Sequence, residues 1–324
     1  MAAPRIFVTR AIPDASLERL RRALPDARVE VNLEDRSLAP AELRSVARGA
    51  DAILCTLADA VDAALLEALA PPLRVVSTFA VGTENIDLAA ARRLGVRVAH
   101  TPGVLTDATA EIAVALLLAC ARRVAEGDRI VRAGRFPGWS PLYGRGFGVY
   151  GKTVGIVGAG RIGRRVAVTL QRGFDCRILV HSRQLHEDWE RELGARFVTL
   201  GALLEESDFV SLHCSLTPET RHLIDAAALS RMRRTACLVN TARGAVVDEA
   251  ALVAALRDGR IAAAGLDVYE REPGLAPGLA ACENAVLLPH LGSATFEARE
   301  AMGRLAVDAI VAVLSGREPE HALV

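Results

Sequence analysis

One stretch near the middle of the chain decides its fold: Thr153-Val154-Gly155-Ile156-Val157-Gly158-Ala159-Gly160-Arg161-Ile162-Gly163. Its apolar first half predicts a buried β-strand, and its second half carries the glycine pattern G-x-G-x-x-G. A second apolar run, Arg177–Val180, follows after a stretch of helical length, which gives the strand–turn–helix–strand setting that the pattern requires. The stretch therefore predicts an α/β unit that binds a dinucleotide.

Each glycine of the pattern has a physical task. Gly158 permits a tight turn, Gly160 lets the backbone approach a pyrophosphate, and Gly163 allows the helix to pack closely on the strand. The first N–H groups of the helix, which include those of Arg161 and Ile162, have no partner within the helix and carry a partial positive charge. We therefore expect these five residues to bind the phosphates of the cofactor.

The residues after the second strand favour one dinucleotide over the other. An acidic residue usually stands there and binds the ribose 2′-hydroxyl group of NAD. This chain has Val180-His181-Ser182-Arg183 instead, and its next carboxylate is Glu187. Ser182 and Arg183 can bind a 2′-phosphate, which a carboxylate would repel. We expect NADP(H) as the preferred cofactor, with NAD(H) as the alternative.

Short β-rich runs alternate with amphipathic helical runs on both sides of this stretch. The alternation indicates parallel sheets covered by helices. The strands expected in the first hundred residues are Ile6–Thr9, Val29–Val31, Ala52–Cys55, Val75–Phe79 and Arg97–His100. Those expected in the second unit are Thr153–Val157, Arg177–Val180, Phe209–His213, Cys237–Asn240, Ala262–Leu266 and Val286–Leu287.

Two further helices determine the expected domain organisation. A helix from about Thr106 to Ala133 is apolar around most of its circumference and should be buried. A last helix, Thr295–Leu314, has no strand after it and should pack back on the first unit. We predict two Rossmann- or flavodoxin-like parallel-sheet domains. The substrate-binding domain is discontinuous and spans residues 1–100 plus 291–324, and the dinucleotide-binding domain spans residues 101–290.

The composition argues against several other functions. Lys plus Arg and Asp plus Glu both number 39, which is unfavourable for nucleic-acid and membrane-surface partners. The six cysteines lack zinc-ligand spacing, so we expect free, structural thiols and no bound metal. No secretory leader and no apolar run of the ~20 residues that span a bilayer are visible. We expect a cytoplasmic protein.

Three segments of the second unit carry polar residues at or just beyond predicted strands. They hold Arg243 in Asn-Thr-Ala-Arg-Gly, Glu272 in Glu-Pro, and His290 in Pro-His-Leu-Gly-Ser-Ala. Because ligands bind beyond the carboxyl ends of parallel strands, these side chains should converge beside the nicotinamide. A histidine can supply a proton near neutral pH, a glutamate can fix its tautomer, and an arginine can bind a carboxylate.

With these motifs in this order, the chain resembles the D-isomer-specific 2-hydroxyacid dehydrogenase family over essentially its whole length. Residues 101–111 (TPGVLTDATAE) are similar to the glyoxylate/hydroxypyruvate reductase branch of that family. The resemblance implies that Arg243, Glu272 and His290 form a catalytic triad. It also implies hydride transfer from a nicotinamide to a small 2-oxo acid, with the D-2-hydroxy acid as product.

The resemblance implies further contacts. Those expected for the substrate are Leu57, Ala80, Val81, Gly82, Arg243, Arg299 and Trp139. Trp139 would reach the neighbouring subunit of a homodimer. The further contacts expected for the cofactor are Thr109, Cys214, Ser215, Thr241, Ala242, Asp267, His290 and Ser293.

The leading hypothesis is an NADPH-preferring glyoxylate/hydroxypyruvate reductase that acts as a homodimer. A broader D-2-hydroxyacid dehydrogenase, of the 2-ketoacid or phosphoglycerate type, is the nearest alternative. An alternative from another class is a dinucleotide-sensing interaction protein that has kept the fold.

Overall fold

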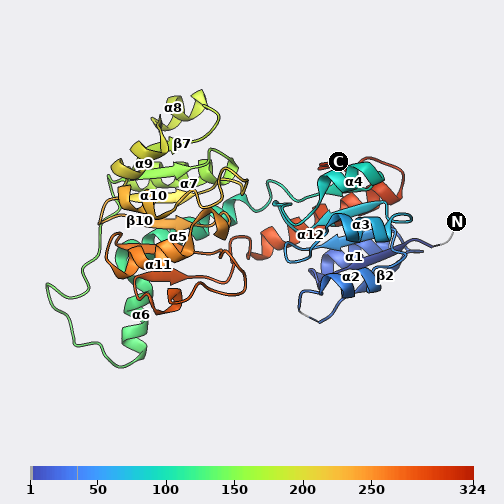
Figure 1. Ribbon diagram of the computed structural model, residues 1–324, viewed down its shortest axis with the longest axis horizontal. Helices are drawn as coiled ribbons and strands as arrows, with labels where there is room; N and C mark the ends of the chain where they lie inside the picture. Colours follow the sequence, from blue (N-terminus) through green and yellow to red (C-terminus); the bar gives the residue numbers. More distant parts are fainter. Residues whose placement is uncertain (1–2, 35) are drawn as a thin grey trace. The chain divides into compact units, whose positions relative to one another are not determined.

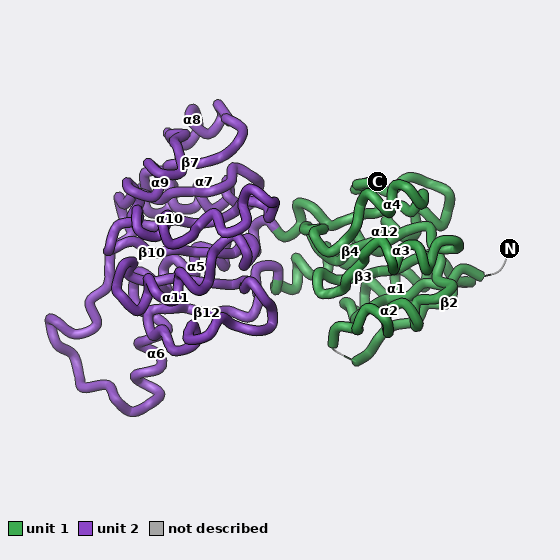
Figure 2. The backbone as a smooth tube through the Cα atoms, viewed as in Figure 1, with its two compact units in different colours: residues 1–105, 294–324 green, residues 106–293 purple. Residues whose placement is uncertain are grey.

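The computed structural model describes residues 3–34 and 36–324, which form two compact units (Figures 1 and 2). Unit 1 comprises residues 1–105 and 294–324, and unit 2 comprises residues 106–293. Residues 1, 2 and 35 of the predicted first domain lie outside the described residues. Each unit is a parallel sheet with helices packed on it, so the predicted fold class is confirmed.

Unit 1 has a five-stranded sheet in the order β2-β1-β3-β4-β5. Its strands are β1 (Arg5–Val8), β2 (Arg28–Val31), β3 (Ala52–Cys55), β4 (Val75–Thr78) and β5 (Arg97–Ala99). Its helices are α1 (Asp14–Ala23), α2 (Pro40–Val46), α3 (Ala63–Leu69), α4 (Leu88–Leu94) and α12 (Phe296–Leu314). Strands β3 and β4 are buried at every residue, as expected for parallel strands covered on both faces.

Helix α12 joins unit 1 from the far end of the chain and packs against α1 and β4. The close approach to α1 depends on Gly303, because a Cβ atom there would lie 2.2 Å from Oγ of Ser16. On the sheet side, the hydroxyl group of Ser77 donates a 2.9 Å hydrogen bond to the carbonyl of Ala306. Unit 1 is therefore built from two separate stretches of the chain.

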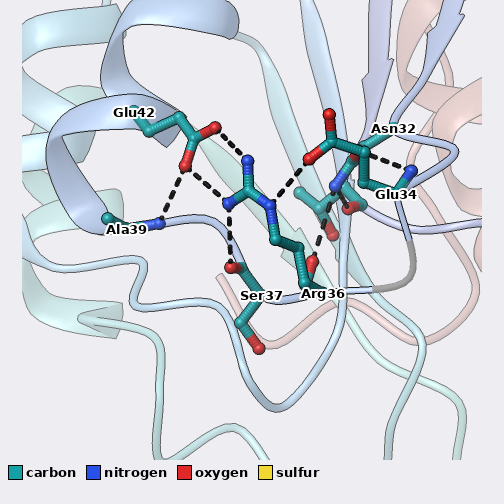
Figure 3. Close-up of polar contacts among 7 residues, drawn as sticks. Asn32, Glu34, Arg36, Ser37, Ala39 and Glu42 are labelled. Atoms are coloured by element: carbon teal, nitrogen blue, oxygen red, sulfur yellow. Dashed lines mark hydrogen bonds and ion pairs between the residues drawn. The ribbon is translucent and has the colours of Figure 1, made fainter.

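The loop before α2 is fixed by one arginine (Figure 3). The guanidinium group of Arg36 donates two hydrogen bonds to Glu42 and one to Glu34. Glu42 in turn accepts a 3.4 Å hydrogen bond from the N–H of Ala39 at the start of the helix. These ion pairs are solvent-exposed, so they order the loop more than they stabilise the fold.

Unit 2 has a seven-stranded sheet in the order β12-β11-β10-β9-β6-β7-β8. Its strands are β6 (Thr153–Val157), β7 (Arg177–His181), β8 (Arg196–Phe197), β9 (Phe209–Leu212), β10 (Cys237–Asn240), β11 (Ala263–Leu266) and β12 (Ala285–Leu287). Its α-helices are α5 (Thr106–Arg122), α6 (Val124–Arg132), α7 (Arg161–Phe174), α8 (Glu187–Leu193), α9 (Leu200–Glu206), α10 (Ala226–Arg231) and α11 (Glu249–Arg257), with 3₁₀ turns η1 (Gly244–Val246) and η2 (Leu279–Ala281).

Helices cover both faces of the unit 2 sheet. One core packs side chains of α5, α7 and α8 against the sheet, and the other packs those of α9, α10 and α11. The strand order reverses at β6, which pairs with β7 on one side and with β9 on the other. The crevice beyond the carboxyl ends of β6 and β9 is where such sheets bind ligands.

The prediction of a single long helix from about Thr106 to Ala133 is wrong. The helix breaks at Arg123, whose backbone is left-handed with a φ of 55°, and α6 has no buried residue. The cause is a returning loop that packs on the end of α5. Phe147 donates its N–H to the carbonyl of Ala121 at 2.7 Å, and a Cβ atom on Gly146 would lie 2.3 Å from that same oxygen. Strand β8 was also not expected, because two residues carry no periodic pattern.

Candidate active site

The glycine loop lies at the point where the order of the unit 2 strands reverses. Gly158 has a φ of 104°, and a Cβ atom there would lie 2.6–2.7 Å from the backbone of His213 and Cys214. A Cβ atom on Gly163 would lie 2.3 Å from the carbonyl of Gly158. The loop after β6 therefore packs directly on the loop after β9, and only glycine fits at both positions. This placement also brings Cys214 and Ser215, two of the expected cofactor contacts, beside the glycine loop.

Gly160 differs from the other two glycines. It is the N-cap residue of α7, and a Cβ atom there would meet no protein atom within 4 Å. No side chain caps α7, so the N–H groups of Arg161, Ile162 and Gly163 in its first turn keep their capacity to bind an anion. A glycine that packing does not require, next to uncapped N–H groups, fits a pyrophosphate that approaches the backbone.

The end of β7 carries no carboxylate. Ser182 is partly exposed and Arg183 is exposed directly after the strand. Arg183 lies close enough to the loop after β9 to contribute to a lowered pKa of Glu219, after the larger effects of hydrogen bonds from Thr217 and from the Glu219 backbone. Asp188, in the first turn of α8, faces Arg164 of α7 at 3.5 Å. Acidic helix α8 is thus paired with α7. The two residues directly after β7 are a serine and an arginine.

The loops after β10 and β11 are locked together by a close backbone approach. A Cβ atom on Gly244 would lie 1.8 Å from the carbonyl carbon of Tyr269. Any other residue at this position would therefore clash with the Tyr269 backbone unless the loop moved. The buried side chain of Asn240 braces the turn before Gly244. It accepts a 3.0 Å hydrogen bond from the N–H of Ala242 and donates a 2.9 Å hydrogen bond to the carbonyl of Arg243. The turn that presents Arg243 is therefore fixed by its own strand end.

Tyr269 connects the two segments that carry the acidic and basic candidates. Its N–H donates a 3.0 Å hydrogen bond to Oε1 of Glu272, and its hydroxyl group donates a 2.8 Å hydrogen bond to the carbonyl of Leu288. Leu288 follows β12 and precedes His290 by two residues. Oε2 of Glu272 then lies 2.9 Å from Nδ1 of His290. The structure thus brings Glu272 and His290 together as a hydrogen-bonded pair.

His290 is held by a buried aspartate. Its backbone is left-handed with a φ of 57°, and the N–H groups of the next two residues, Leu291 and Gly292, point to the carboxylate of Asp267 at 2.6 and 2.7 Å. Burial of Asp267 raises the pKa of its carboxyl group, and these two N–H groups oppose that effect. Asp267 is expected from the sequence as a cofactor contact, and the structure shows that both its oxygens bind the backbone after His290.

Glu272 is surrounded so that its ionised form is favoured. Burial opposes ionisation, but the hydrogen bond and charge of His290, the N–H of Tyr269 and the charge of Arg243 together lower the pKa of Glu272. Arg243 therefore lies within electrostatic reach of the pair, and its Nη1 donates to the carbonyl of Ala242 at 2.7 Å. An ionised Glu272 fixes the proton of His290 on Nδ1 and leaves Nε2 as the nitrogen available to a ligand.

The expected nicotinamide contacts gather beside this pair. A Cβ atom on Gly292 would lie 3.2 Å from Asp267 and 3.4 Å from the side chain of Thr109, which is buried on α5. Thr241, next to Ala242, is buried, and its hydroxyl group has no hydrogen-bond partner among the described residues. Ser293 follows Gly292 and is partly exposed. A buried hydroxyl group without a partner fits a site in which the bound cofactor supplies one.

The substrate candidates of unit 1 form a separate group. Ala80, Val81 and Gly82 follow β4, and Leu57 follows β3. The carbonyl of Val81 lies 2.9 Å from Nδ1 of His100, which fixes the loop. Arg299 of α12 is partly buried, its guanidinium carbon lies 5.9 Å from the centre of the Phe79 ring, and burial lowers its pKa. An arginine held in this way can bind a carboxylate with little loss of side-chain entropy.

Trp139 is the one expected substrate contact that lies far out on a loop. It is 85% exposed, between α6 and β6. Its expected role requires a second subunit, so it stays a prediction.

Several residues hold the site rather than form it, and they are not among the site residues expected from the sequence. These are Asn240, Glu249, Tyr269 and His100, together with a serine-bonded His213 beneath the glycine loop. Their signal is weak, because a polar residue at a strand end is common. Asn240 does begin the quoted Asn-Thr-Ala-Arg-Gly motif, and Tyr269 lies three residues before Glu272.

In the part of the chain that the structure describes, no helix is both long and apolar enough to cross a membrane. Among residues 3–34 and 36–324, no group of three or more His, Cys, Asp or Glu side chains can hold a metal ion.

Comparison with known proteins gives matches over the whole chain. The family described as D-isomer specific 2-hydroxyacid dehydrogenase, NAD binding domain, matches residues 114–292. A glyoxylate reductase of Korarchaeum cryptofilum is 47% identical over 98% of this chain and 95% of its own. A solved structure of a Thermus thermophilus protein is 45% identical with a TM-score of 0.91, covering 99% of this chain and 100% of its own.

A third relative was solved with ligands. It is an NADPH-dependent glyoxylate/hydroxypyruvate reductase of Sinorhizobium meliloti, in complex with NADP and malonate. It is 34% identical with a TM-score of 0.84, and the match covers 99% of this chain and 97% of that one.

The histidine beneath the glycine loop generates a prediction of pH dependence. Burial lowers the pKa of His213 to about 3, from an ordinary value near 6.5. Below pH 6.5 the unfolded chain therefore binds a proton that the folded chain does not, so stability falls as the pH falls. Between pH 7 and pH 5 the wild-type free energy of unfolding should fall by roughly 1–2 kcal/mol more than that of His213→Gln. Urea unfolding at both pH values measures this, and parallel behaviour of the two proteins would contradict it.

Proposed function

The chain belongs to the D-isomer-specific 2-hydroxyacid dehydrogenase family, and from that premise we propose that it reduces glyoxylate or hydroxypyruvate with NADPH. The observation that carries the proposal is the 2.9 Å hydrogen bond between Glu272 and His290, on the same unit as the glycine loop. It is supported by curated relatives named glyoxylate reductase that are 45–48% identical to this chain.

The chemistry requires a hydride for C2 of the 2-oxo acid and a proton for its oxygen. The bound dihydronicotinamide supplies the hydride. His290 donates the proton from Nε2, because its Nδ1 is held by the ionised Glu272. His290 is about one-third exposed, so solvent can return the proton to it after each turnover. The product is the 2-hydroxy acid, and the hydrogen bond between Nδ1 and Glu272 orients the imidazole ring for the proton transfer.

Substrate binding is assigned to arginine and backbone groups. Arg243 is proposed to bind the substrate carboxylate and to polarise the reacting carbonyl with its fork of N–H donors. In unit 1, the substrate contacts are proposed to be the N–H groups of Val81 and Gly82, together with Leu57 and Ala80. Arg299, partly buried beside Phe79, is proposed to bind the far end of a longer acid such as hydroxypyruvate.

Cofactor binding is assigned to unit 2. The glycine loop and the first turn of α7 are proposed to bind the pyrophosphate, and Thr241, Asp267 and their neighbours the nicotinamide end. Ser182 and Arg183 are proposed to bind the 2′-phosphate of NADP(H), which makes NADPH the preferred cofactor over NADH. The absence of a carboxylate within the four residues after β7 supports this assignment.

We also propose a cytoplasmic homodimer. The segment from α6 to Tyr150 exposes large apolar side chains that water does not favour, namely Val124, Val131, Phe136, Trp139, Leu142, Tyr143, Phe147 and Tyr150. A second copy of the chain is proposed to cover them, with Trp139 reaching the substrate of that copy. Six free cysteines, five of them buried, fit a reducing compartment.

A panel of substrates tests the proposed function. Initial rates of NADPH and NADH oxidation are measured with glyoxylate, hydroxypyruvate, pyruvate and 2-oxoisocaproate. We expect the highest kcat/KM with NADPH and either glyoxylate or hydroxypyruvate. Preference for a bulkier acid would replace the reductase assignment with a broader D-2-hydroxyacid dehydrogenase. Cofactor binding without turnover of any acid would instead favour a dinucleotide-sensing protein.

A charge deletion tests the cofactor preference. Arg183→Ala should raise the KM for NADPH by roughly ten- to a hundredfold, because one charge-assisted bond to phosphate is lost, and should leave the KM for NADH within about twofold. Arg172→Ala, which removes an exposed arginine near the far end of α7, is the matched control and should change neither value. Equal effects of Arg183→Ala on both cofactors would exclude the 2′-phosphate assignment.

A further inference from the structure

One buried carboxylate of unit 2 has no place in the proposed chemistry. Glu249, the first residue of α11, is only 4% exposed. Its Oε1 accepts a 2.7 Å hydrogen bond from the N–H of Glu270, and its Oε2 accepts a 3.2 Å hydrogen bond from the N–H of Ala276. Both oxygens are therefore bound to the backbone of one short segment, at its two ends.

This segment, residues 270–276, carries Glu272. Within it, Gly274 donates its N–H to the carbonyl of Arg271 at 2.8 Å, which closes a tight turn around Glu272. Apart from the hydrogen bond that the N–H of Tyr269 donates to Glu272, the turn has few other supports, because residues 271–275 are all exposed. The position of the Glu272 carboxylate relative to His290 thus depends on what holds the two ends of the turn.

At position 249, only a carboxylate side chain can accept hydrogen bonds from both ends of the 270–276 turn. Each of its oxygens accepts one N–H, and the ionised form makes both hydrogen bonds stronger than neutral ones. A glutamine has the same shape but presents one oxygen and one N–H₂ group, so one end of the turn would face a donor instead of an acceptor. A buried carboxylate without these two donors would be strongly unfavourable, which ties α11 to the turn.

We propose that Glu249 is a positioning residue for proton transfer: it fixes both ends of the 270–276 turn and so holds Glu272 against His290. This inference rests on the proposed function, in which Glu272 and His290 are the proton-transfer pair. The neighbouring Asp248 has a different task, because its side chain caps α11 by accepting a 3.0 Å hydrogen bond from the N–H of Ala251. Of these two adjacent carboxylates, one therefore positions the turn and the other stabilises the helix.

The test compares Glu249→Gln with Asp248→Ala as a matched control that destabilises the same helix. For each variant we measure thermal stability, kcat, the KM for NADPH, and the isotope effect with NADPH deuterated at the transferred position. Glu249→Gln should lower kcat roughly ten- to a hundredfold, because the pair is misplaced, and should leave the KM for NADPH within about twofold. Its isotope effect on kcat should rise, since chemistry becomes slower than product release. Asp248→Ala should lose thermal stability with kcat near that of the wild type.

An unchanged kcat in Glu249→Gln overturns the proposal, and so does an equal fall in kcat in Asp248→Ala. If Glu249→Gln does not fold, Ala276→Pro tests the same contact from the side of the turn. Proline has no N–H, so the hydrogen bond from residue 276 to Oε2 of Glu249 is lost. Ala276→Pro should also lower kcat and leave the KM for NADPH nearly unchanged. A kcat of Ala276→Pro equal to that of the wild type overturns the proposal.

Glu272→Gln separates this proposal from the proposed function. If the wild type reduces none of the 2-oxo acids, the proposed function fails and this inference with it. If the wild type turns over and Glu272→Gln keeps its kcat, the reductase assignment stands, but Glu272 takes no part in proton transfer and the inference about Glu249 fails. If Glu272→Gln loses turnover while Glu249→Gln keeps it, only the inference about Glu249 fails.

Discussion

The close backbone approach between Gly244 and Tyr269 is the constraint on which the rest of the site depends. With 1.8 Å between a hypothetical Cβ atom and the Tyr269 backbone, the loops after β10 and β11 can lie together only if residue 244 is glycine. Tyr269 then holds Glu272 through its N–H and the segment before His290 through its hydroxyl group. A single steric requirement thereby determines where an arginine, a glutamate and a histidine from three strand ends meet.

Around this contact, buried polar side chains bind the backbone instead of one another. Asn240, Glu249 and Asp267 each satisfy two backbone groups in the loops that present Arg243, Glu272 and His290. Burying such groups is favourable only when every hydrogen bond is made, so these loops have one arrangement with low energy. The side chains that would react are left partly exposed on a rigid frame, which is the condition for a pre-organised site.

The sequence predicted those parts of the molecule whose physics is local. All strands except β8 follow from apolar runs, and the glycine loop follows from the left-handed backbone of Gly158 and from the close packing at Gly163. The pairing of Glu272 with His290 also followed, because strand ends of a parallel sheet share one edge. The break at Arg123 and the clamp by Glu249 did not follow, because each depends on a segment distant in sequence, the 145–147 loop and the 270–276 turn.

The most direct test of the account is single-turnover reduction of glyoxylate by enzyme loaded with NADPH, in the wild type and in His290→Gln. If His290 donates the proton, the rate of NADPH oxidation should fall roughly a thousandfold in the variant while the Kd for NADPH changes less than about threefold. A single-turnover rate close to that of the wild type would contradict the account, since the frame around Tyr269 would then position a pair that takes no part in the reaction.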